Sequence, residues 1–567
     1  MKISEVSVHN YRTISDGKVK LGSYSNFVGP NSAGKSNLIR SILQFYDYEG
    51  FKYNRESDFP RFDVNDNDVW VDVEYELLDV EYLALDEQYR LPSKKMKLRR
   101  KLESKPLYGY KGAELSTDAF YGYPNVGKAK IGDVIYIPAV PESEEAFKFS
   151  GPSAVRDSIV KIIGKILNES SELKSISEEL KKYIGSIGDK TNEDGNTLNS
   201  FIYRINDSIK SMNMEFLLDT GEVKPDIIIK SLFSVKLKDT RLGREVDQGS
   251  IGTGQLRHLL YNMIRIYHEI TASRPNEDAQ KVIFSPKLNL LLFEEPEAYL
   301  HPPQQVALNK ALKDISKNEN WQVIITSHSP VFLSKDTNDL TKIARFKRDS
   351  NGKSQIFQVT EETIKDLLSG SPVLIDFLTK KKSEAGISNS LKSDIEKVLT
   401  GTMPDLDGFR YQSFLDRERT SAFFTDKVII CEGKSDKLFI EHIIEKNDLD
   451  EHGIYAIDSL GKYNLHRFMK LFEQFGIKHL VMYDSDEHKR DKVSFALNEF
   501  IEGMKNSTTV STIVIPKDLE AQLKITIPNN RDDLKPLMVL KHIKEEGIDD
   551  LKGLEKRILE DINKLIG

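Results

Sequence analysis

Six acidic residues follow three apolar stretches in the last third of the sequence, and carboxylates in that arrangement can bind metal ions. They are Glu432 and Asp436 after VIIC, Asp484 and Asp486 after HLVMY, and Asp518 and Glu520 after TIVIP. Carboxylates gathered at one edge of a parallel sheet would repel one another, and their pKa values would rise, unless divalent cations lay between them. Oxygen ligands favour Mg²⁺ or Mn²⁺. Taken separately, each pair is more typical of a solvated loop at a strand end.

A glycine-rich segment near the start of the chain, GPNSAGKS at residues 29–36, has the spacing of a P-loop. It lies between a predicted strand, LGSYSNFVG, and a predicted helix, NLIRSILQFY. Backbone amides in such a loop surround phosphate oxygens, while Lys35 can reach the outer phosphates and Ser36 can ligate Mg²⁺. The sequence therefore predicts ATP binding by Asn31, Gly34, Lys35 and Ser36.

Two further stretches predict the chemistry of a nucleotide triphosphatase. LLFEEP ends a buried strand with Glu294 and Glu295, of which one can hold a metal ion and the next can polarise a water molecule. SHSP ends the following strand with His328, which is suited to sensing a terminal phosphate. Between these motifs and the P-loop, a glycine-rich turn supplies further candidate phosphate contacts, which are Ser250, Gly252, Gly254 and Gln255. By itself this turn is equally typical of a helix N-cap.

In this order, the four motifs resemble those of ABC-type ATPases. The resemblance implies that two ATPase heads sandwich the nucleotide, with the serine-glycine turn of one subunit over the phosphate bound by Lys35 of another. A homo-oligomer, a dimer or a tetramer, is therefore expected. Glu294 departs from the pattern, because many members carry an aspartate at that position.

The apolar pattern predicts the elements that hold these residues. Residues 69–77 alternate as a strand with one buried face, and LNLLLF (288–293) and WQVIIT (321–326) are typical of buried parallel strands. Residues 155–212 instead have the pattern of charged amphipathic helices, which predicts an inserted helical hairpin. Residues 383–412 are polar and interrupted by Gly and Pro, so we expect a linker there.

The composition bounds the class of protein. A chain of 567 residues, 39% hydrophobic and 30% charged, is too long for one core and is typical of a water-soluble protein with several domains. The single cysteine excludes an internal disulfide, and no run approaches the roughly 20 apolar residues of a membrane span, so we expect a cytoplasmic protein. The basic stretch KKMKLRRKL (94–102) could bind phosphate or form a solvated face.

The acids of the C-terminal part stand in the order Glu-Gly-x-x-Asp, Gly461, Asp-x-Asp, which resembles the Toprim metal domain of topoisomerases, primases and some nucleases. An ABC-type ATPase followed by a Toprim domain is the arrangement of the OLD (overcoming lysogenization defect) family of ATP-dependent endonucleases, which includes the nuclease subunit of the Gabija anti-phage system. The matching motifs are EEPEAYLHPPQQ (294–305), SHSP (327–330), FFTDKVIICEGKSD (423–436), DSD (484–486) and DLE (518–520).

The expected fold class is therefore α/β, an ABC-type ATPase head with a helical insertion followed by a Rossmann-like Toprim domain. The expected segments are the ATPase domain at 1–345 with its insertion at about 150–215, a linker or helical connection at 346–420, and the Toprim nuclease domain at 421–567.

The resemblance also implies roles for individual residues. Glu432 would be a metal ligand or acid/base, and the metal ligands would be completed by Asp436, Asp484, Asp486, Asp518 and Glu520. A late lysine would neutralise the phosphate in the transition state; Lys535 is favoured because it precedes a proline, with Lys541 as the alternative, and either is also compatible with a surface role. The expected reaction is hydrolysis of phosphodiester bonds in double-stranded DNA at a Toprim two-metal site, where one ion lowers the pKa of the attacking water and a second stabilises the leaving oxygen.

Two functions of different classes remain open from the sequence. The first is a nucleotide-regulated DNA endonuclease in anti-phage defence, with a partner protein from a defence operon. The second is a non-cleaving DNA-binding or repair ATPase of the RecF/SMC sort, which would not need intact carboxylates at three strand ends. The sequence does not show whether ATP activates or restrains cleavage.

Overall fold

The computed structural model describes most of the chain outside one central region. The described residues are 1–104, 106–122, 130–139, 175, 178–179, 182, 197–209, 237–240, 243–246, 252–272, 284–333, 337–402, 404–528, 531–545, 547–548 and 551–567. Among the described helices, none combines the length and the apolar character needed to cross a membrane.

The chain divides into two units. The first contains residues 1–134 and 282–567, and the second contains residues 135–281. Strand β8 (Asp133–Ile137) crosses the boundary. The helical insertion expected at about 150–215 falls mainly outside the described residues, apart from helix α7 (Leu198–Ile209).

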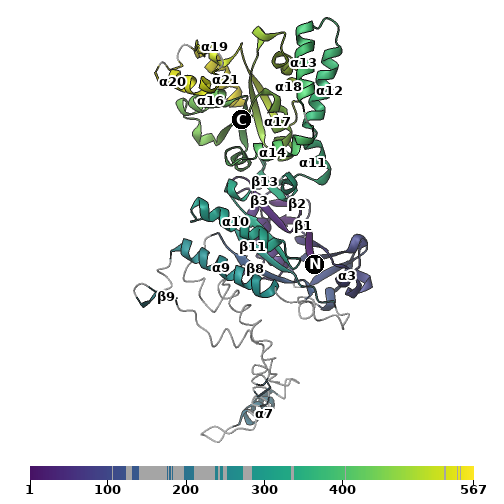
Figure 1. The fold of residues 1–567 in the computed structure, drawn as a ribbon. Coiled ribbons are helices and arrows are strands. Elements are labelled where there is room, and N and C mark those ends of the chain that lie inside the picture. Colours follow the sequence, from purple (N-terminus) through teal and green to yellow (C-terminus); the bar gives the residue numbers. More distant parts are fainter. Residues whose placement is uncertain are drawn as a thin grey trace. The chain divides into compact units, whose positions relative to one another are not determined.

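The first unit begins with an antiparallel sheet (Figure 1). Its strands, in spatial order, are β2 (Ile14–Lys20), β1 (Lys2–Tyr11), β4 (Trp70–Glu76), β5 (Lys95–Lys101), β6 (Leu107–Lys111) and β7 (Glu114–Ala119). Val71, Val73 and Tyr75 of β4 are buried, as the alternation at 69–77 predicts. One face of this sheet therefore packs against the core.

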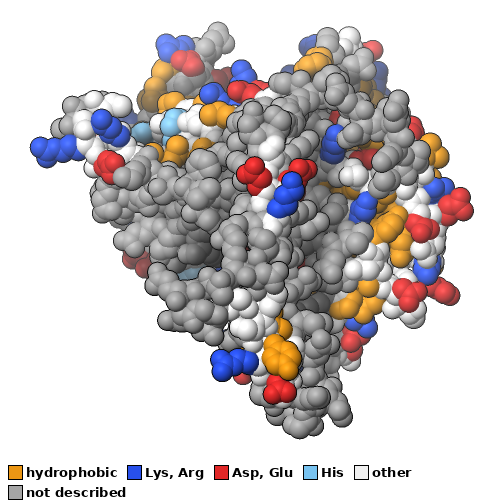
Figure 2. Space-filling view, turned by 90° about the horizontal axis from the view of Figure 1, so that it is seen from below, with side chains coloured by type: hydrophobic (Ala, Val, Ile, Leu, Met, Phe, Trp, Pro, Cys, Tyr) orange, Lys and Arg blue, Asp and Glu red, His pale blue; other side chains and the backbone are white. Residues whose placement is uncertain are grey.

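The basic stretch at 94–102 forms strand β5, and three of its basic side chains pair with acids of the neighbouring strand β4. Arg99 and Lys97 lie 2.6 and 3.0 Å from Asp72 carboxylate oxygens, and Lys95 lies 2.6 Å from Glu74. On the face drawn in Figure 2, acidic and basic side chains of the described residues are likewise intermixed. Part of the positive charge of this stretch is thus paired with acids, which favours the solvated-face alternative over a phosphate-binding surface.

A second sheet, of six strands, carries the P-loop, and five of its strands lie from one edge in the order β14-β13-β3-β12-β11. They are β14 (Ser354–Gln358), β13 (Ile343–Arg348), β3 (Tyr24–Val28), β12 (Trp321–Thr326) and β11 (Asn289–Glu294). The pairs β11–β12, β12–β3 and β3–β13 are parallel, as the apolar runs predict. The sheet extends beyond residue 345, the expected end of the ATPase domain, because β14 closes it as an antiparallel partner of β13.

A third sheet lies in the C-terminal part, and all its pairings are parallel, in the order β16-β15-β17-β18. Its strands are β15 (Lys427–Cys431), β16 (Ile454–Asp458), β17 (Lys478–Asp484) and β18 (Thr509–Ile515). One face is covered by α16 (Lys434–Lys446), α19 (Leu519–Gln522), α20 (Lys535–Glu545) and α21 (Lys552–Ile566). The other is covered by α17 (Leu465–Gln474) and α18 (Val493–Gly503) (Figure 1).

The region expected to be a linker at 383–412 is largely helical and packed. The helices before and across it are α11 (Glu361–Leu367), α12 (Gly370–Ser383), α13 (Asn389–Gly401), α14 (Asp407–Phe414) and α15 (Arg417–Thr420). Leu391, Ile395 and Tyr411 are buried in the same apolar core as α17 and α18. Of the two alternatives given for 346–420, a linker or a helical connection, the described residues form helices, because a few well-spaced apolar residues suffice to bury one face of an otherwise polar helix.

The second unit is described in part. It contains the short antiparallel pair β9 (Leu237–Asp239) and β10 (Arg244–Val246) and the long helix α9 (Thr253–Ala272).

Candidate functional site

The P-loop joins β3 to helix α1 (Lys35–Phe45) and has the backbone that phosphate binding requires. Gly29 and Gly34 have φ values of 130° and 111°, which only glycine adopts readily. A Cβ atom at Gly29 would lie 2.1 Å from the carbonyl oxygen of Phe346, so the loop is pressed against β13. The Lys35 ammonium donates to the carbonyls of Gly29 and Pro30, both at 2.9 Å, and Asn31 and Ser36 are exposed.

The predicted acids and histidine lie at the ends of the neighbouring strands. Glu294 ends β11 and is buried, and Glu295 follows it with a φ of 44°. His328 Nε2 lies 3.9 Å from Glu295 Oε1. Burial and the positive charge of Lys35 lower the pKa of His328 to about 4, so the imidazole is neutral at pH 7. Burial lowers the pKa of Lys35 to about 8, partly offset by Glu295 and Glu297.

Glu297 is a residue of this site that sequence reasoning missed. Its carboxylate accepts hydrogen bonds from the backbone amide of His328 and from the Ser327 hydroxyl, the latter at 3.0 Å. Burial raises the pKa of Glu297 above its ordinary value. The acid therefore connects the EEPE motif to the SHSP turn, and the third glutamate of EEPE is the signal that could have indicated it.

Arginine side chains near the P-loop were also missed. A cavity of about 400 Å³ is lined in part by Arg12, Asn37 and Arg348. The Asn37 amide donates to the Thr13 hydroxyl at 2.7 Å, and Arg12 pairs with Asp58 at 2.7 Å. Arg12 and Thr13 belong to the turn between β1 and β2, whose position beside the P-loop only the fold shows.

The serine-glycine turn belongs to the second unit. Ser250 lies outside the described residues. Gly252 directly precedes α9, and Gly254 and Gln255 lie in its first turn, where the Leu256 amide donates to the Gly252 carbonyl at 3.1 Å. The turn therefore opens a helix, as expected.

In the C-terminal sheet, the carboxyl ends of the neighbouring strands β15, β17 and β18 bring several of the predicted carboxylates close together, and we call this place the crevice. Glu432 follows β15, and its Oε2 accepts a hydrogen bond at 3.2 Å from the backbone amide of Asp484, the last residue of β17. The Leu519 amide, in the segment after β18, donates to Asp484 Oδ1 at 3.1 Å. Asp436 in the first turn of α16 accepts from the Gly433 amide at 2.9 Å. These contacts join the Glu-Gly, DSD and DLE segments.

The sequence matches two family models. An AAA ATPase domain model matches residues 1–108 and 86–333, and the model described as "Overcoming lysogenization defect protein-like, TOPRIM domain" matches residues 423–486. The chain belongs to the AAA ATPase domain family and carries an OLD-like TOPRIM domain. The expected fold class and the OLD resemblance are thus confirmed.

Two curated relatives align with this AAA ATPase and TOPRIM chain over nearly its whole length. The protein named Old nuclease, from Escherichia phage P2, is 24% identical over 97% of this chain and 91% of its own length. The protein named Endonuclease GajA, from Bacillus cereus, is 22% identical over 94% of this chain and 84% of its own length.

Three carboxylates of the TOPRIM crevice are unfavourable as anions. Burial raises the pKa of Asp436 to about 7, and the negative charges of Glu432 and Glu520 add to the shift. Burial raises the pKa of Asp484 to about 9, with further contributions from Asp436 and Glu432. The pKa of Glu432 is also raised by burial, although the positive charge of Lys462 opposes the shift. A divalent cation would remove this repulsion, so the donor set fits Mg²⁺ or Mn²⁺.

The side chains do not form a closed metal cage. Among the described residues, no group of three or more His, Cys, Asp or Glu side chains is arranged to enclose an ion. Mg²⁺ commonly keeps several water ligands and uses one or two carboxylates together with substrate phosphates. The open crevice therefore fits an ion shared with water and substrate.

The acids differ in how many of their oxygens are already committed. Asp518 Oδ1 caps α19 by accepting from the Ala521 amide at 2.7 Å, and Oδ2 lies 3.5 Å from His488. Asp486 Oδ1 and Oδ2 both accept hydrogen bonds from lysines, at 2.9 Å each. The contribution of Glu520 is different, because its negative charge helps to raise the pKa values of Asp436 and Asp484.

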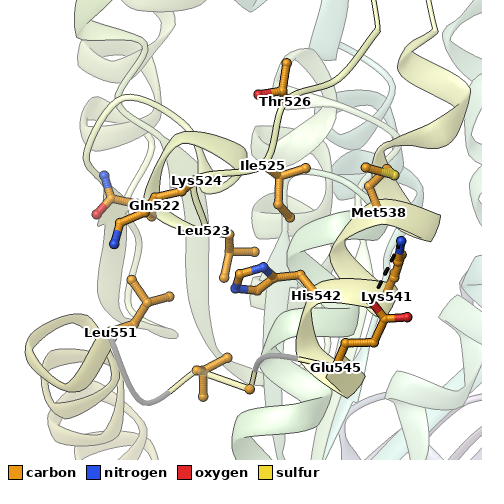
Figure 3. Close-up of a pocket in the computed structure, with 12 residues that line it drawn as sticks. Gln522, Leu523, Lys524, Ile525, Thr526, Met538, Lys541, His542, Glu545 and Leu551 are labelled. Atoms are coloured by element: carbon orange, nitrogen blue, oxygen red, sulfur yellow. Dashed lines mark ion pairs between the residues drawn. The ribbon is translucent and has the colours of Figure 1, made fainter.

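Lys535 and Lys541 lie in different surroundings on α20. The Lys535 ammonium pairs with Asp532 at 3.2 Å, and although burial opposes it, the charges of Glu520, Asp532 and Asp484 raise its pKa. Lys541 instead lines a separate cavity of about 340 Å³ and pairs with Glu545 at 3.7 Å (Figure 3). The surroundings of Lys535 are those expected of a residue that contacts the substrate phosphate.

Two arginines bind segments next to the crevice, one from the ATPase sheet and one from helix α15. Arg345 of β13 is fully buried and donates to the carbonyls of Phe423, Phe475 and Thr425, at 3.1, 2.9 and 2.6 Å, and to the Asp426 carboxylate at 2.6 Å. This interaction joins the strand beside the P-loop to the segment before β15.

The second arginine, Arg419 of α15, holds the end of β16. Its guanidinium donates to the carbonyl oxygen of Asp458 at 2.7 Å and to the Asp458 carboxylate. The next residue, Ser459, donates from its hydroxyl to the Glu432 carbonyl at 3.0 Å. Contacts therefore run from α15 to the backbone of the leading catalytic candidate.

We expect the metal-free protein to lose about 1–2 kcal/mol of stability between pH 7 and pH 9. The folded pKa of Asp484, about 9, lies above its unfolded value, so the folded state keeps a proton that the unfolded state has released, and rising pH removes this advantage. Lys35 acts in the opposite direction, because its folded pKa of about 8 lies below its unfolded value.

Melting temperatures in a chelator at pH 7, 8 and 9 would measure this effect. The matched variant Asp484→Asn keeps Lys35 but cannot titrate at 484, so its melting temperature should fall less. Equal pH dependence in the two proteins would contradict the prediction. Added Mg²⁺ should stabilise the wild type more at pH 9 than at pH 7, because the ion competes with the retained proton.

Proposed function

We propose that the protein is a metal-dependent DNA endonuclease whose cleavage of phosphodiester bonds is controlled by the nucleotide bound to its AAA ATPase domain. The observation that carries the proposal is the crevice in which Glu432, Asp436, Asp484 and Glu520 meet from three strand ends and a helix start. A structural role would not require two of these acids to be buried with pKa values near 7 and 9. The names of both relatives, a nuclease and an endonuclease, support the same reaction.

The residues of the crevice divide the chemistry among them. Mg²⁺ or Mn²⁺, held by Glu432, Asp436, Asp484 and Glu520, would lower the pKa of the attacking water and offset the charge of the leaving oxygen. Glu432 is positioned through its own backbone and through the Asp484 amide, and serves as metal ligand or proton acceptor. Lys535 offsets negative charge on the phosphate oxygens in the transition state.

The nucleotide bound to the ATPase domain controls this cleavage. Lys35, Ser36, Asn31 and Gly34 bind the phosphates of ATP, and Glu294 holds Mg²⁺. Glu295 polarises the attacking water, and neutral His328 accepts or donates a hydrogen bond at the terminal phosphate. The turn of Ser250, Gly252, Gly254 and Gln255 from a second copy completes the site, which implies a homo-oligomer. A role in anti-phage defence, with a partner protein, follows from the OLD resemblance.

Incubation of supercoiled double-stranded plasmid with the full chain and Mg²⁺ or Mn²⁺, with and without ATP, tests the function. Nicked or linear products that require the metal ion are expected. Lys35→Ala should lose ATP turnover and cleave at one rate whether or not ATP is added. Intact plasmid under every condition, with ATP turnover retained in the wild type, would overturn the proposal and favour a non-cleaving RecF/SMC-like ATPase.

The two late lysines are expected to differ in cleavage. Lys535→Met should slow cleavage about 100-fold, because a positive charge facing Glu520 and Asp484 is lost where the phosphate charge develops. Lys541→Met removes the same charge from a later position of helix α20, where Lys541 pairs with Glu545. This substitution should change the cleavage rate less than about threefold. Single-turnover plasmid cleavage measures both. A larger defect in Lys541→Met would reverse the assignment.

A further inference from the structure

A lysine that neither the motifs nor the proposed chemistry includes is buried inside the TOPRIM crevice. Lys462 follows Gly461 and begins the short helical turn Lys462–Asn464 after β16. Its side chain is 3% exposed. The ammonium donates to Asp486 Oδ2 at 2.9 Å and to the Asp484 carbonyl oxygen, and it lies 5.3 Å from the centre of the Tyr483 ring. Both acceptors belong to the DSD segment.

The backbone around Lys462 is held against the Glu432 turn. The Gly461 amide donates to the Glu432 carbonyl at 2.8 Å, and the Ser459 hydroxyl donates to the same oxygen at 3.0 Å. Lys462 thereby joins the segment after β16 to the segments after β15 and β17. A buried ammonium is unfavourable unless an acid pairs with it, and the acid that pairs with Lys462 is Asp486.

The negative charge of this counterion, Asp486, is balanced by two lysine side chains. Oδ2 accepts from Lys462 and Oδ1 accepts from Lys489, each at 2.9 Å, and the Asp486 carboxylate is 5% exposed. Its backbone has a φ of 49° and its amide donates to the Lys517 carbonyl at 2.9 Å, which fixes the turn.

The two aspartates of the DSD segment therefore differ in the charges that surround them. Asp484 lies against Glu432, whose Oε2 accepts from the Asp484 amide at 3.2 Å, and its own Oδ1 accepts from the Leu519 amide at 3.1 Å rather than from a lysine. Asp486 already has a positive charge on each oxygen. A divalent ion on Asp486 would have to displace the buried ammonium of Lys462, which comes from the neighbouring segment after β16.

We propose that Lys462 is a fixed cation of the TOPRIM crevice, occupying on Asp486 the place of a second divalent ion, so that the crevice takes up a single divalent ion on the side of Glu432 and Asp484. Lys462 is in this sense a positioning residue. The inference rests on the proposed function only in that the crevice binds metal, and metal uptake can be measured without DNA.

Mn²⁺ binding to the full chain, without nucleotide or DNA, tests the inference by titration calorimetry and by electron paramagnetic resonance of free Mn²⁺. We expect one ion per chain in the wild type and two in Lys462→Met, because Asp486 is then free to bind metal. Lys462→Arg keeps the positive charge and should restore one ion. The matched control is Lys489→Met, which removes the 45% exposed partner of the same carboxylate and should still bind one ion.

A second test substitutes the two aspartates, and its result does not depend on whether Lys462→Met folds. Asp484→Asn should weaken Mn²⁺ binding more than tenfold, whereas Asp486→Asn should change it less than about threefold. Two ions in the wild type, or equal losses in the two aspartate variants, would overturn the inference. One ion in a wild type that leaves plasmid intact would instead overturn the proposed function and support the place of Lys462.

Discussion

Glu432→Gln is expected to reduce plasmid cleavage on the order of 1,000-fold while ATP turnover stays near the wild-type rate. Glutamine has the same shape and retains an oxygen that can accept the hydrogen bond from the Asp484 amide. It lacks the charge needed to bind a metal ion or to accept a proton. The loss would therefore report chemistry at this carboxylate. Initial cleavage rates and phosphate release, measured in the same buffer, give both quantities.

A matched control for Glu432→Gln lies on helix α16. Glu441 is 45% exposed and pairs with Lys437 at 3.2 Å, outside the crevice. Glu441→Gln removes the same charge from the same domain and should leave cleavage within about twofold, since exposed ion pairs contribute little. Wild-type cleavage by Glu432→Gln would place the reaction elsewhere in the chain.

Arg345→Met is expected to destabilise the first unit by about 3–5 kcal/mol. The fully buried guanidinium has four acceptors, and methionine fills similar space without any donor. The carbonyls of Phe423 and Phe475 would lose their donor beside the apolar core. Because β13 also presses on the P-loop at Gly29, we expect the variant to lose part of the effect of ATP on cleavage.

Denaturant unfolding and the ratio of cleavage rates with and without ATP measure the two consequences of Arg345→Met. Lys347 is the control, because it lies on the same strand and also feels the charge of Asp426. Lys347→Met should cost less than about 1 kcal/mol and keep the wild-type response to ATP. An unchanged unfolding free energy in Arg345→Met would show that the four hydrogen bonds contribute no net stability.

Local patterns in the sequence were sufficient for the strands and for most of the candidate site. Continuous apolar runs predict β11, β12 and β15, and these strands are parallel and buried. Since side chains after parallel strands meet at one edge of the sheet, the order of motifs also predicts that Glu432 and Asp484 lie together. The same reasoning did not predict the helices at 383–412, because the apolar residues of that segment are few.

The sequence by itself determined the residue types, their order and the ends of the strands, and with them the nucleotide loop and the carboxylate crevice. Only the tertiary structure decided which other side chains enter these places. Glu297 reaches SHSP, Arg345 crosses from β13 to Phe423, and Lys462 reaches Asp486. The physical reason is that such contacts join segments far apart in the chain, so no local spacing records them. A buried charge is stabilised by whichever partner the packed fold brings to it.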